Sequence, residues 1–157
     1  MPNIAKIKLN DSQRRFIDAV ATLLLPWGMQ TGVARLYALL ILQPEPASLD
    51  AICDALEISK STASVTARQL EQAKLIRRVP VKGSKRVLYV ASSDNAATVG
   101  DQALMLGRFA ELLTSQQSAE GSAVVSQRLQ TMADFSRVMQ QVMESAICSH
   151  RQTHGQD

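Results

Sequence analysis

The chain has 157 residues, of which 46% are hydrophobic and 20% are charged, and its formal net charge is +3. This composition is typical of a globular domain with enough residues to bury a core, and it excludes general disorder. No stretch approaches the roughly 18 consecutive apolar residues of a membrane span, and two cysteines in a chain of this length indicate a reducing compartment. We therefore expect a cytoplasmic protein with no membrane partner.

The small net charge hides an uneven distribution. Between positions 60 and 86 there are eight basic residues and a single acid, Glu71, which gives this segment a charge of +7 and leaves −4 for the rest of the chain. The eight are Lys60, Arg68, Lys74, Arg77, Arg78, Lys82, Lys85 and Arg86. A basic segment in an otherwise acidic chain is typical of a localised site for a polyanion.

The first elements are predicted to be helices. Asn10 or Asp11 can cap a helix that runs to Pro26, and the sequence Pro26-Trp27-Gly28 is typical of a turn. A second helix is expected from Gly32 to Leu42. Its apolar residues cover most of the helix circumference, which predicts that it lies inside the domain.

Two further helices follow, each with a serine cap. Ser48 begins a short helix that ends near Ile58, and Ser59 begins another that reaches about Leu75. In the second of these, small and apolar residues fall on one face, which we expect to be buried. The opposite face has short or flexible side chains: Ser61, Thr62, Ser64, Val65 and Arg68.

From Ile76 the pattern changes to that of a β-hairpin. The turn is Lys82-Gly83-Ser84, and Arg86 to Val90 forms the returning strand. Pro80 has no amide hydrogen to donate, so its strand is expected at the edge of a very small sheet. The hairpin therefore has a basic tip.

The C-terminal part predicts two long helices with apolar residues at heptad spacing, from Val99 to Leu113 and from Val125 to Ala146. We expect a polar break at Gln116 to Gly121 and a loose tail from Gln152 to Asp157. The two stripes are expected to hold two subunits together. Three further apolar residues widen the second stripe and indicate more than one packing neighbour: Phe135, Val138 and Val142.

The order of helix, tight connection, helix and basic hairpin predicts a mainly α protein with a winged helix-turn-helix, which is a three-helix core with a hairpin wing. We expect an N-terminal helix joining the dimerisation region over residues 1–31. A DNA-binding domain should cover residues 32–94, and dimerisation helices with a tail should cover residues 95–157.

In this interpretation the exposed face of the helix after Ser59 enters the major groove of DNA. Arg68 could bond guanine, and Thr62 and Val65 could contact a thymine methyl group. The remaining candidates would contact the DNA backbone or the minor groove: Lys60, Ser61, Ser64, Lys82, Ser84, Lys85 and Arg86. Taken singly, each element has a plainer interpretation as a solvated helix or a surface loop. One such helix reads few base pairs, so we expect a homodimer on a pseudo-palindromic operator, acting as a repressor.

Several segments of this region resemble the recognition helix and wing of MarR-type bacterial repressors. They are Ser59 to Ser64, Arg68 to Glu71, Leu75 to Val79 and Gly83 to Tyr89. Trp27-Gly28 and Ala34 to Leu40 are similar, more narrowly, to the GbsR-type branch. The resemblance implies a homodimeric winged helix regulator, and the branch implies sensing of choline or betaine. Val65 stands where many relatives have a longer polar or basic residue, so no base preference carries over.

A quaternary-ammonium effector would be recognised by aromatic faces. Five of the six aromatic residues lie outside the wing, namely Phe16, Trp27, Tyr37, Phe109 and Phe135. Simple core packing is the alternative interpretation of these rings.

An enzyme is not expected, because no nucleophile or carboxylate forms a recognisable catalytic pattern with His150 and His154. These histidines and Cys148 could be metal ligands, but they lack an obvious fourth partner, so we predict no metal site and no cofactor. Cys53 is interpreted as a core residue rather than a redox switch. The competing function is a winged helix that binds an acidic protein partner without reading DNA sequence.

Overall fold

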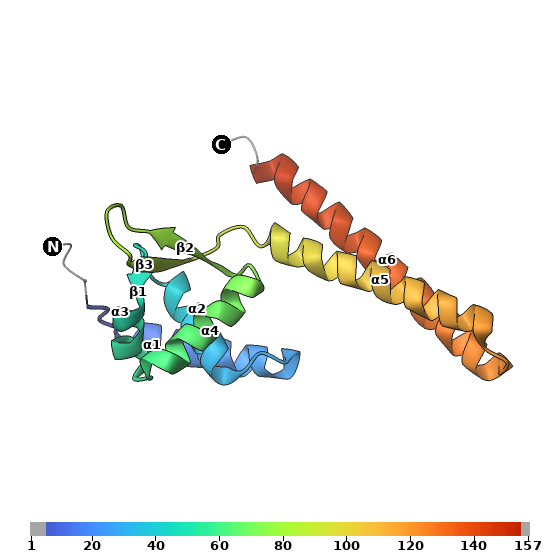
Figure 1. Ribbon diagram of the computed structural model, residues 1–157, viewed down its shortest axis with the longest axis horizontal. Coiled ribbons are helices and arrows are strands. Elements are labelled where there is room, and N and C mark those ends of the chain that lie inside the picture. Colours follow the sequence, from blue (N-terminus) through green and yellow to red (C-terminus); the bar gives the residue numbers. More distant parts are fainter. Residues whose placement is uncertain (1–5, 155–157) are drawn as a thin grey trace. The chain divides into compact units, whose positions relative to one another are not determined.

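The computed structural model describes residues 6–154. Its internal contacts divide the chain into two units, the first ending at Ser93 and the second beginning at Asp94. The first unit contains α1 (Asp11–Leu24), the short 3-10 helix η1 (Leu25–Trp27), α2 (Thr31–Ile41), β1 (Ala47–Ser48), α3 (Leu49–Leu56), α4 (Lys60–Gln72), β2 (Ile76–Pro80) and β3 (Val87–Ala91). The second contains α5 (Ala96–Ala119) and α6 (Ala123–His154). The fold is mainly helical with one small sheet, as predicted (Figure 1).

Helix α1 begins and ends where its sequence signals predict. The Asn10 side chain accepts a hydrogen bond of 2.8 Å from the Gln13 amide, and the Gln13 side chain accepts one of 3.0 Å from the Asn10 amide. This reciprocal capping box satisfies two amides that have no partner within the helix. Pro26 lies in η1, and Gly28 follows with a φ of 85°, a left-handed conformation that favours glycine.

The core of the first unit is built around α2. This helix buries six residues, Val33, Ala34, Leu36, Ala38, Leu39 and Leu40, which confirms the expected interior position. Ile17 of α1, Ile52 of α3 and Leu70 of α4 pack into the same cluster. Each of these three large side chains is less than 2% exposed, so the helices are fixed to one another through a shared apolar interior.

Helices α3 and α4 form the helix-turn-helix. The Ser48 hydroxyl accepts a 3.1 Å hydrogen bond from the Ala51 amide, and the Ser59 hydroxyl accepts one of 3.1 Å from the Thr62 amide, so both predicted caps are confirmed. Between the helices, Glu57 takes a left-handed φ of 55° and ends α3. The turn is therefore tight, and α4 starts three residues later.

The sheet has three antiparallel strands in the order β1-β3-β2. Pro80 lies in β2, which is an edge strand, as predicted. The two-residue strand β1 was not expected, and it pairs Ala47 with Tyr89 of β3. The loop between β2 and β3 projects from this sheet as the wing (Figure 1).

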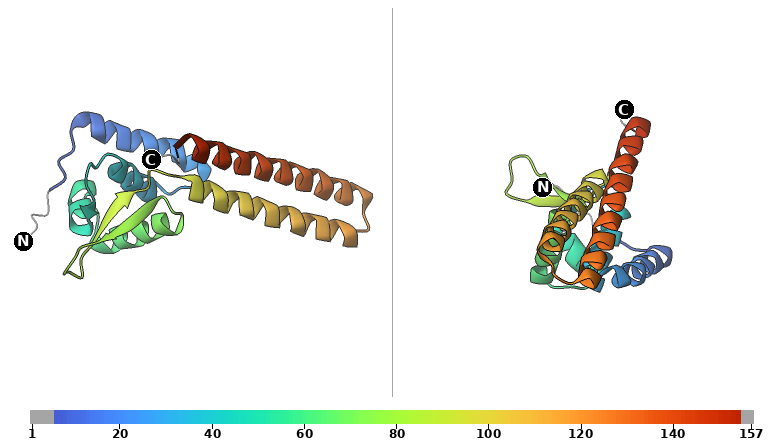
Figure 2. Two further views of the ribbon diagram at one scale, coloured as in Figure 1. Left: turned by 90° about the horizontal axis from the view of Figure 1, so that it is seen from above. Right: turned by 90° about the vertical axis from the view of Figure 1, so that its right-hand side faces the viewer.

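In the second unit α5 and α6 run side by side as an antiparallel hairpin (Figures 1 and 2). Two expectations about this region are wrong. Helix α5 continues through the polar segment to Ala119, so the break is limited to residues 120–122. The expected tail begins as helix, because α6 extends to His154, and residues 155–157 lie outside the described part of the chain.

The heptad stripes of this hairpin face each other within one chain. Ala103, Ala110 and Leu113 of α5 are buried, and so are Ala133 and Ser136 of α6. Part of each stripe is therefore used within the chain, and the expected seam between subunits stays a prediction. The three residues that widen the second stripe stay on the outside, with Phe135 66%, Val138 54% and Val142 55% exposed.

Candidate nucleic-acid interface

Helix α4 has one buried face and one exposed face. Ala63, Ala67 and Leu70 belong to the core of the first unit, as the spacing predicts. The candidate DNA contacts lie on the other side, where Ser61, Thr62, Val65 and Arg68 are exposed and Ser64 is half-buried. This face therefore presents short side chains and one long cation, which suits entry into a groove.

The first turn of α4 has a compact network of hydroxyl groups. The Ser59 hydroxyl lies 3.0 Å from that of Ser61 and 2.8 Å from that of Thr62. Because the amides and the dipole of a helix N-terminus favour anions, these hydroxyls are well placed for a phosphate. The Thr62 hydroxyl is used in this network, which leaves the methyl group for the predicted thymine contact.

Lys60, at the start of α4, is paired with an acid of the preceding helix. Its Nζ lies 2.9 Å from Oδ1 of Asp50. The hydrogen bond and the negative charge of Asp50 raise the pKa of Lys60. Lys60 is therefore charged but partly balanced by this carboxylate, which the charge count along the sequence does not reveal.

The wing ends in an ordered turn. Gly83 has a φ of 77°, the Ser84 amide donates to the Val81 carbonyl at 3.1 Å, and the Ser84 hydroxyl accepts from the Arg86 amide at 3.1 Å. Ser84 is thus a turn residue as well as a candidate contact. Within residues 6–154 no ion pair involves Lys82, Lys85 or Arg86, and all three are exposed. Their charges are available to a polyanion.

A second ion pair of this region was missed by the sequence analysis. Nε of Arg78 lies 2.8 Å from Oε1 and 2.9 Å from Oε2 of Glu71. The single acid of the basic segment therefore balances one particular arginine. No local pattern signals this pair, because it joins the end of a helix to the middle of a strand.

The five candidate effector rings are divided between the units: Phe16, Trp27 and Tyr37 in the first, and Phe109 and Phe135 in the second. Among the described residues, no ring contact joins any two of them. Trp27 is 86% exposed. Neither unit by itself therefore brings these rings together into a cage.

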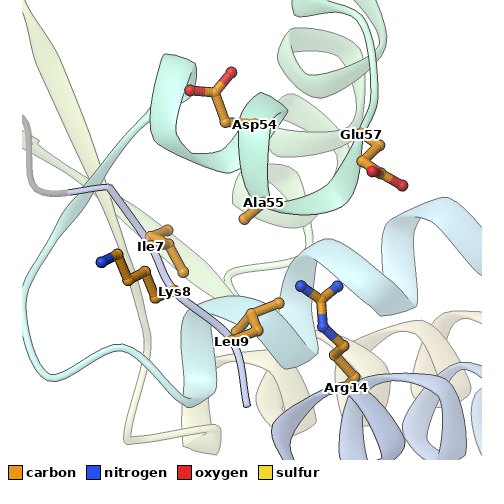
Figure 3. A pocket seen from close by; sticks show the side chains of 7 residues that line it. All are labelled: Ile7, Lys8, Leu9, Arg14, Asp54, Ala55 and Glu57. Atoms are coloured by element: carbon orange, nitrogen blue, oxygen red, sulfur yellow. The ribbon is translucent and has the colours of Figure 1, made fainter. Parts of the chain in front are cut away.

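Two grooves among the described residues are lined largely by polar and charged side chains and contain no aromatic ring. One in the first unit has a volume of about 270 Å³ and lies between the N-terminal segment with α1 and the end of α3 (Figure 3). Its lining residues are Ile7, Lys8, Leu9, Arg14, Asp54, Ala55 and Glu57. A second groove of about 340 Å³, on the α5–α6 hairpin, is lined partly by Arg108, Glu111 and Arg137.

The cysteines and histidines form no group of three metal-ligating side chains within the described residues. The rings of His150 and His154 lie 4.6 Å apart, and His150 Nε2 is 3.9 Å from Oδ1 of Asp94. Burial, followed by the charge of Asp50, raises the pKa of the Cys53 thiol. A raised pKa disfavours the thiolate and thus a redox role.

In the part of the chain that the structure describes, no helix is long and apolar enough to span a membrane.

Comparison with known proteins supports the fold. Residues 29–87 match the model of the MarR family, which is less than half of the chain. A crystal structure described as a transcriptional regulator is similar over 90% of this chain and 99% of its own, with a TM-score of 0.80 and 23% identity. A MepR variant from a multidrug-resistant clinical isolate of S. aureus is 18% identical, covers 83% of this chain and 89% of its own, and has a TM-score of 0.43. No curated protein matches.

The structure and these comparisons define a protein with a winged helix fold of the type found in MarR-like regulators.

Proposed function

We propose that this chain is a MarR-type transcriptional regulator that binds double-stranded DNA in a sequence-specific way. The observation that carries the proposal is the position of two complementary surfaces in one unit: the exposed face of α4 and the cationic tip of the wing. A helix face with short side chains and Arg68 suits base edges, while the flexible cations of the tip suit phosphates. The family match over residues 29–87 supports the same function.

We also propose that the protein acts as a homodimer. In the α5–α6 hairpin, Gly107 lies close to the Gln140 side chain, and the Arg137 guanidinium donates a 2.5 Å hydrogen bond to the Thr114 hydroxyl. Large apolar side chains lie on the outside of this hairpin: Leu104, Met105, Phe109 and Leu112 of α5, and Val124, Met132, Phe135, Val138 and Val142 of α6. A set of exposed large apolar residues on one helical hairpin indicates a protein interface. A second copy covering them would bring two α4 helices to one pseudo-palindromic site.

We also propose that the protein represses transcription, since a dimer bound over a promoter blocks polymerase without further contacts. Binding to the chromosome would place the protein in the cytoplasm. A choline-like effector and the GbsR-type branch rest on the resemblance around Trp27. One open ring contributes about 0.5–1 kcal/mol to binding such a cation, so a cage would need several rings.

Selection from a random duplex pool tests the DNA-binding proposal. We expect enrichment of a sequence with two related half-sites about one helical turn apart. A pool that stays random while the protein still binds every duplex equally would contradict sequence recognition. It would favour the alternative, a winged helix whose charge faces an acidic protein partner.

Calorimetry with choline and with glycine betaine tests the effector. The proposal expects binding that weakens the DNA complex and is lost in Trp27→Ala, with ligand-free DNA binding unchanged. No heat of binding at millimolar concentrations of either compound would overturn this part alone.

A further inference from the structure

The pair between Glu71 and Arg78 is a separate attachment between the recognition helix and the wing. Glu71 lies in the last turn of α4, and Arg78 is the central residue of β2. The arginine Nε donates a hydrogen bond of 2.9 Å to Oε2 of Glu71 and lies 2.8 Å from Oε1. A charge-assisted hydrogen bond of this kind holds the two side chains in a defined geometry.

The strand pattern explains why Arg78 reaches the helix. Side chains alternate along a strand, so Arg78 shares a face with Ile76 two residues earlier, whereas Arg77 lies on the opposite face. Ile76 is 3% exposed and belongs to the core cluster that contains Leu70 of α4. The Arg78 side chain therefore leaves β2 on the side of the helix, where the Glu71 side chain is 22% exposed.

The ion pair between Glu71 and Arg78 lies close to the tip of the wing. β2 ends at Pro80, two residues after Arg78, and leads directly into the tip at Lys82. At the start of the strand, the turn after α4 is held by a 3.0 Å hydrogen bond from the Leu75 amide to the Leu70 carbonyl. The ion pair adds a second point of attachment closer to the tip.

We propose that Glu71 is a positioning residue for DNA binding. Through Arg78 it holds β2, and with it the cationic tip, at a fixed place beside α4, and Arg78 serves this attachment instead of contacting phosphate. This inference rests on the proposed DNA-binding function. The neighbouring Arg77 differs from Arg78, because it has no such partner among the described ion pairs and stays available to phosphate.

Glu71→Gln separates the two possible roles of Arg78 by the sign of its effect. If Arg78 contacted phosphate, removal of the competing carboxylate would release it and strengthen binding. If Glu71 positions the wing, the same variant weakens binding, by about two- to fivefold, the range expected for a half-exposed ion pair. Arg78→Gln should weaken binding equally, and the double variant should be no weaker than either single one.

Salt dependence gives a second readout. Loss of a phosphate contact lowers the slope of log K against log salt by about one unit. We expect this slope to be unchanged in Arg78→Gln, and to fall in Lys85→Gln at the tip. The charge-swapped protein, Glu71→Arg with Arg78→Glu, should regain affinity, since it restores the pair at constant net charge.

Hydrogen exchange without DNA distinguishes a failure of this inference from a failure of the proposed function. Glu71→Gln should speed exchange of the β2 and β3 amides, while the amides of α2 stay protected. Unchanged exchange, stronger DNA binding in Glu71→Gln, or a reduced salt slope in Arg78→Gln would overturn the positioning role. A wild-type protein that binds no duplex would overturn the proposed function, and the exchange experiment would still report whether Glu71 holds the wing.

Discussion

The two units of this chain bury very different residues. In the first, large side chains such as Ile17, Leu36 and Ile52 are almost completely enclosed. In the α5–α6 hairpin the buried residues are mostly small, such as Ala103 and Ala133, and several large apolar residues, such as Phe109 and Phe135, are exposed. Because burial of large apolar side chains dominates the stability of a domain, the first unit has the better filled core.

Residues at and beside the heptad spacing of α5 and α6 therefore differ in size and in exposure. Small residues at and beside the heptad positions let α5 and α6 approach closely, as at Gly107, where an added Cβ would lie 2.7 Å from Oε1 of Gln140. Several of the larger residues beside them are exposed, and in the proposed dimer they would face the second copy. A heptad stripe therefore identifies helices that pack, but the size of its residues indicates which partner each face meets.

The largest expected effect tests the α5–α6 hairpin as a dimer interface. Phe135→Glu places a charge on the outer apolar face, and burying an unpaired carboxylate should cost about 3 kcal/mol or more in each subunit. We expect sedimentation to show monomers at concentrations where the wild type is a dimer. Gln141→Glu, at an exposed position of the same helix, is the matched control and should remain dimeric. A dimer that persists in Phe135→Glu would remove this face from the interface.

A second substitution tests the core of the first unit. Leu36 is fully buried in α2, so Leu36→Ala should lower the free energy of unfolding by about 2–5 kcal/mol through lost burial and the cavity left behind. Chemical denaturation measures this loss. Leu25→Ala, at an exposed position of η1, should change stability by less than about 0.5 kcal/mol. Equal effects of the two variants would show that the packing is wrongly assigned.

Substitutions in α4 and in the wing are expected to have a smaller effect, and they test the separate roles proposed for these two elements. If Arg68 makes the proposed forked contact to a base edge, Arg68→Ala should cost about 1–3 kcal/mol on the selected site and relax its base preference. Lys85→Ala should weaken all duplexes alike and reduce the salt slope by about one unit. Arg15→Ala, an exposed cation of α1, is the charge-matched control. If Lys85→Ala changed the base preference and Arg68→Ala did not, the roles would be reversed.

The smallest effect comes from the acid beside the interface. Asp50→Asn removes the partner of Lys60 without changing the size of the side chain. Since the released cation can pair with phosphate, we expect affinity for any duplex to rise about two- to fivefold at low salt and less at high salt. Glu45→Gln, outside this ion pair, should have little effect. Weaker binding in Asp50→Asn would indicate that Asp50 holds Lys60 in place for DNA instead of competing for it.

Local signals predicted most of the first unit. The caps at Asn10, Ser48 and Ser59 act within three residues, so the sequence places the helix starts well. The wing and its edge proline were also predicted. Strand β1 was missed because Ala47 pairs with Tyr89, far along the chain, and two residues have no pattern of their own.

The sequence predicted less well those features that depend on contacts between residues far apart in the chain. Whether a stripe packs within the chain or against another copy depends on the placement of a second helix, which periodicity does not contain. The pairing of Glu71 with Arg78 likewise follows from the turn that brings β2 beside α4. The polar residues from Gln116 to Ser118 indicated a break, yet they continue α5 because exposed polar side chains do not interrupt a helix.

The central claim is that the first unit reads DNA while the hairpin joins two chains on one site. Sedimentation of the protein with the selected duplex, and with a duplex that keeps one half-site and scrambles the other, tests it most directly. The account predicts two chains on the full site and an affinity for the half-site duplex that falls by about 2 kcal/mol or more, as several mismatched base pairs would cause. A single chain on the full site, bound as tightly as to scrambled DNA, would contradict it.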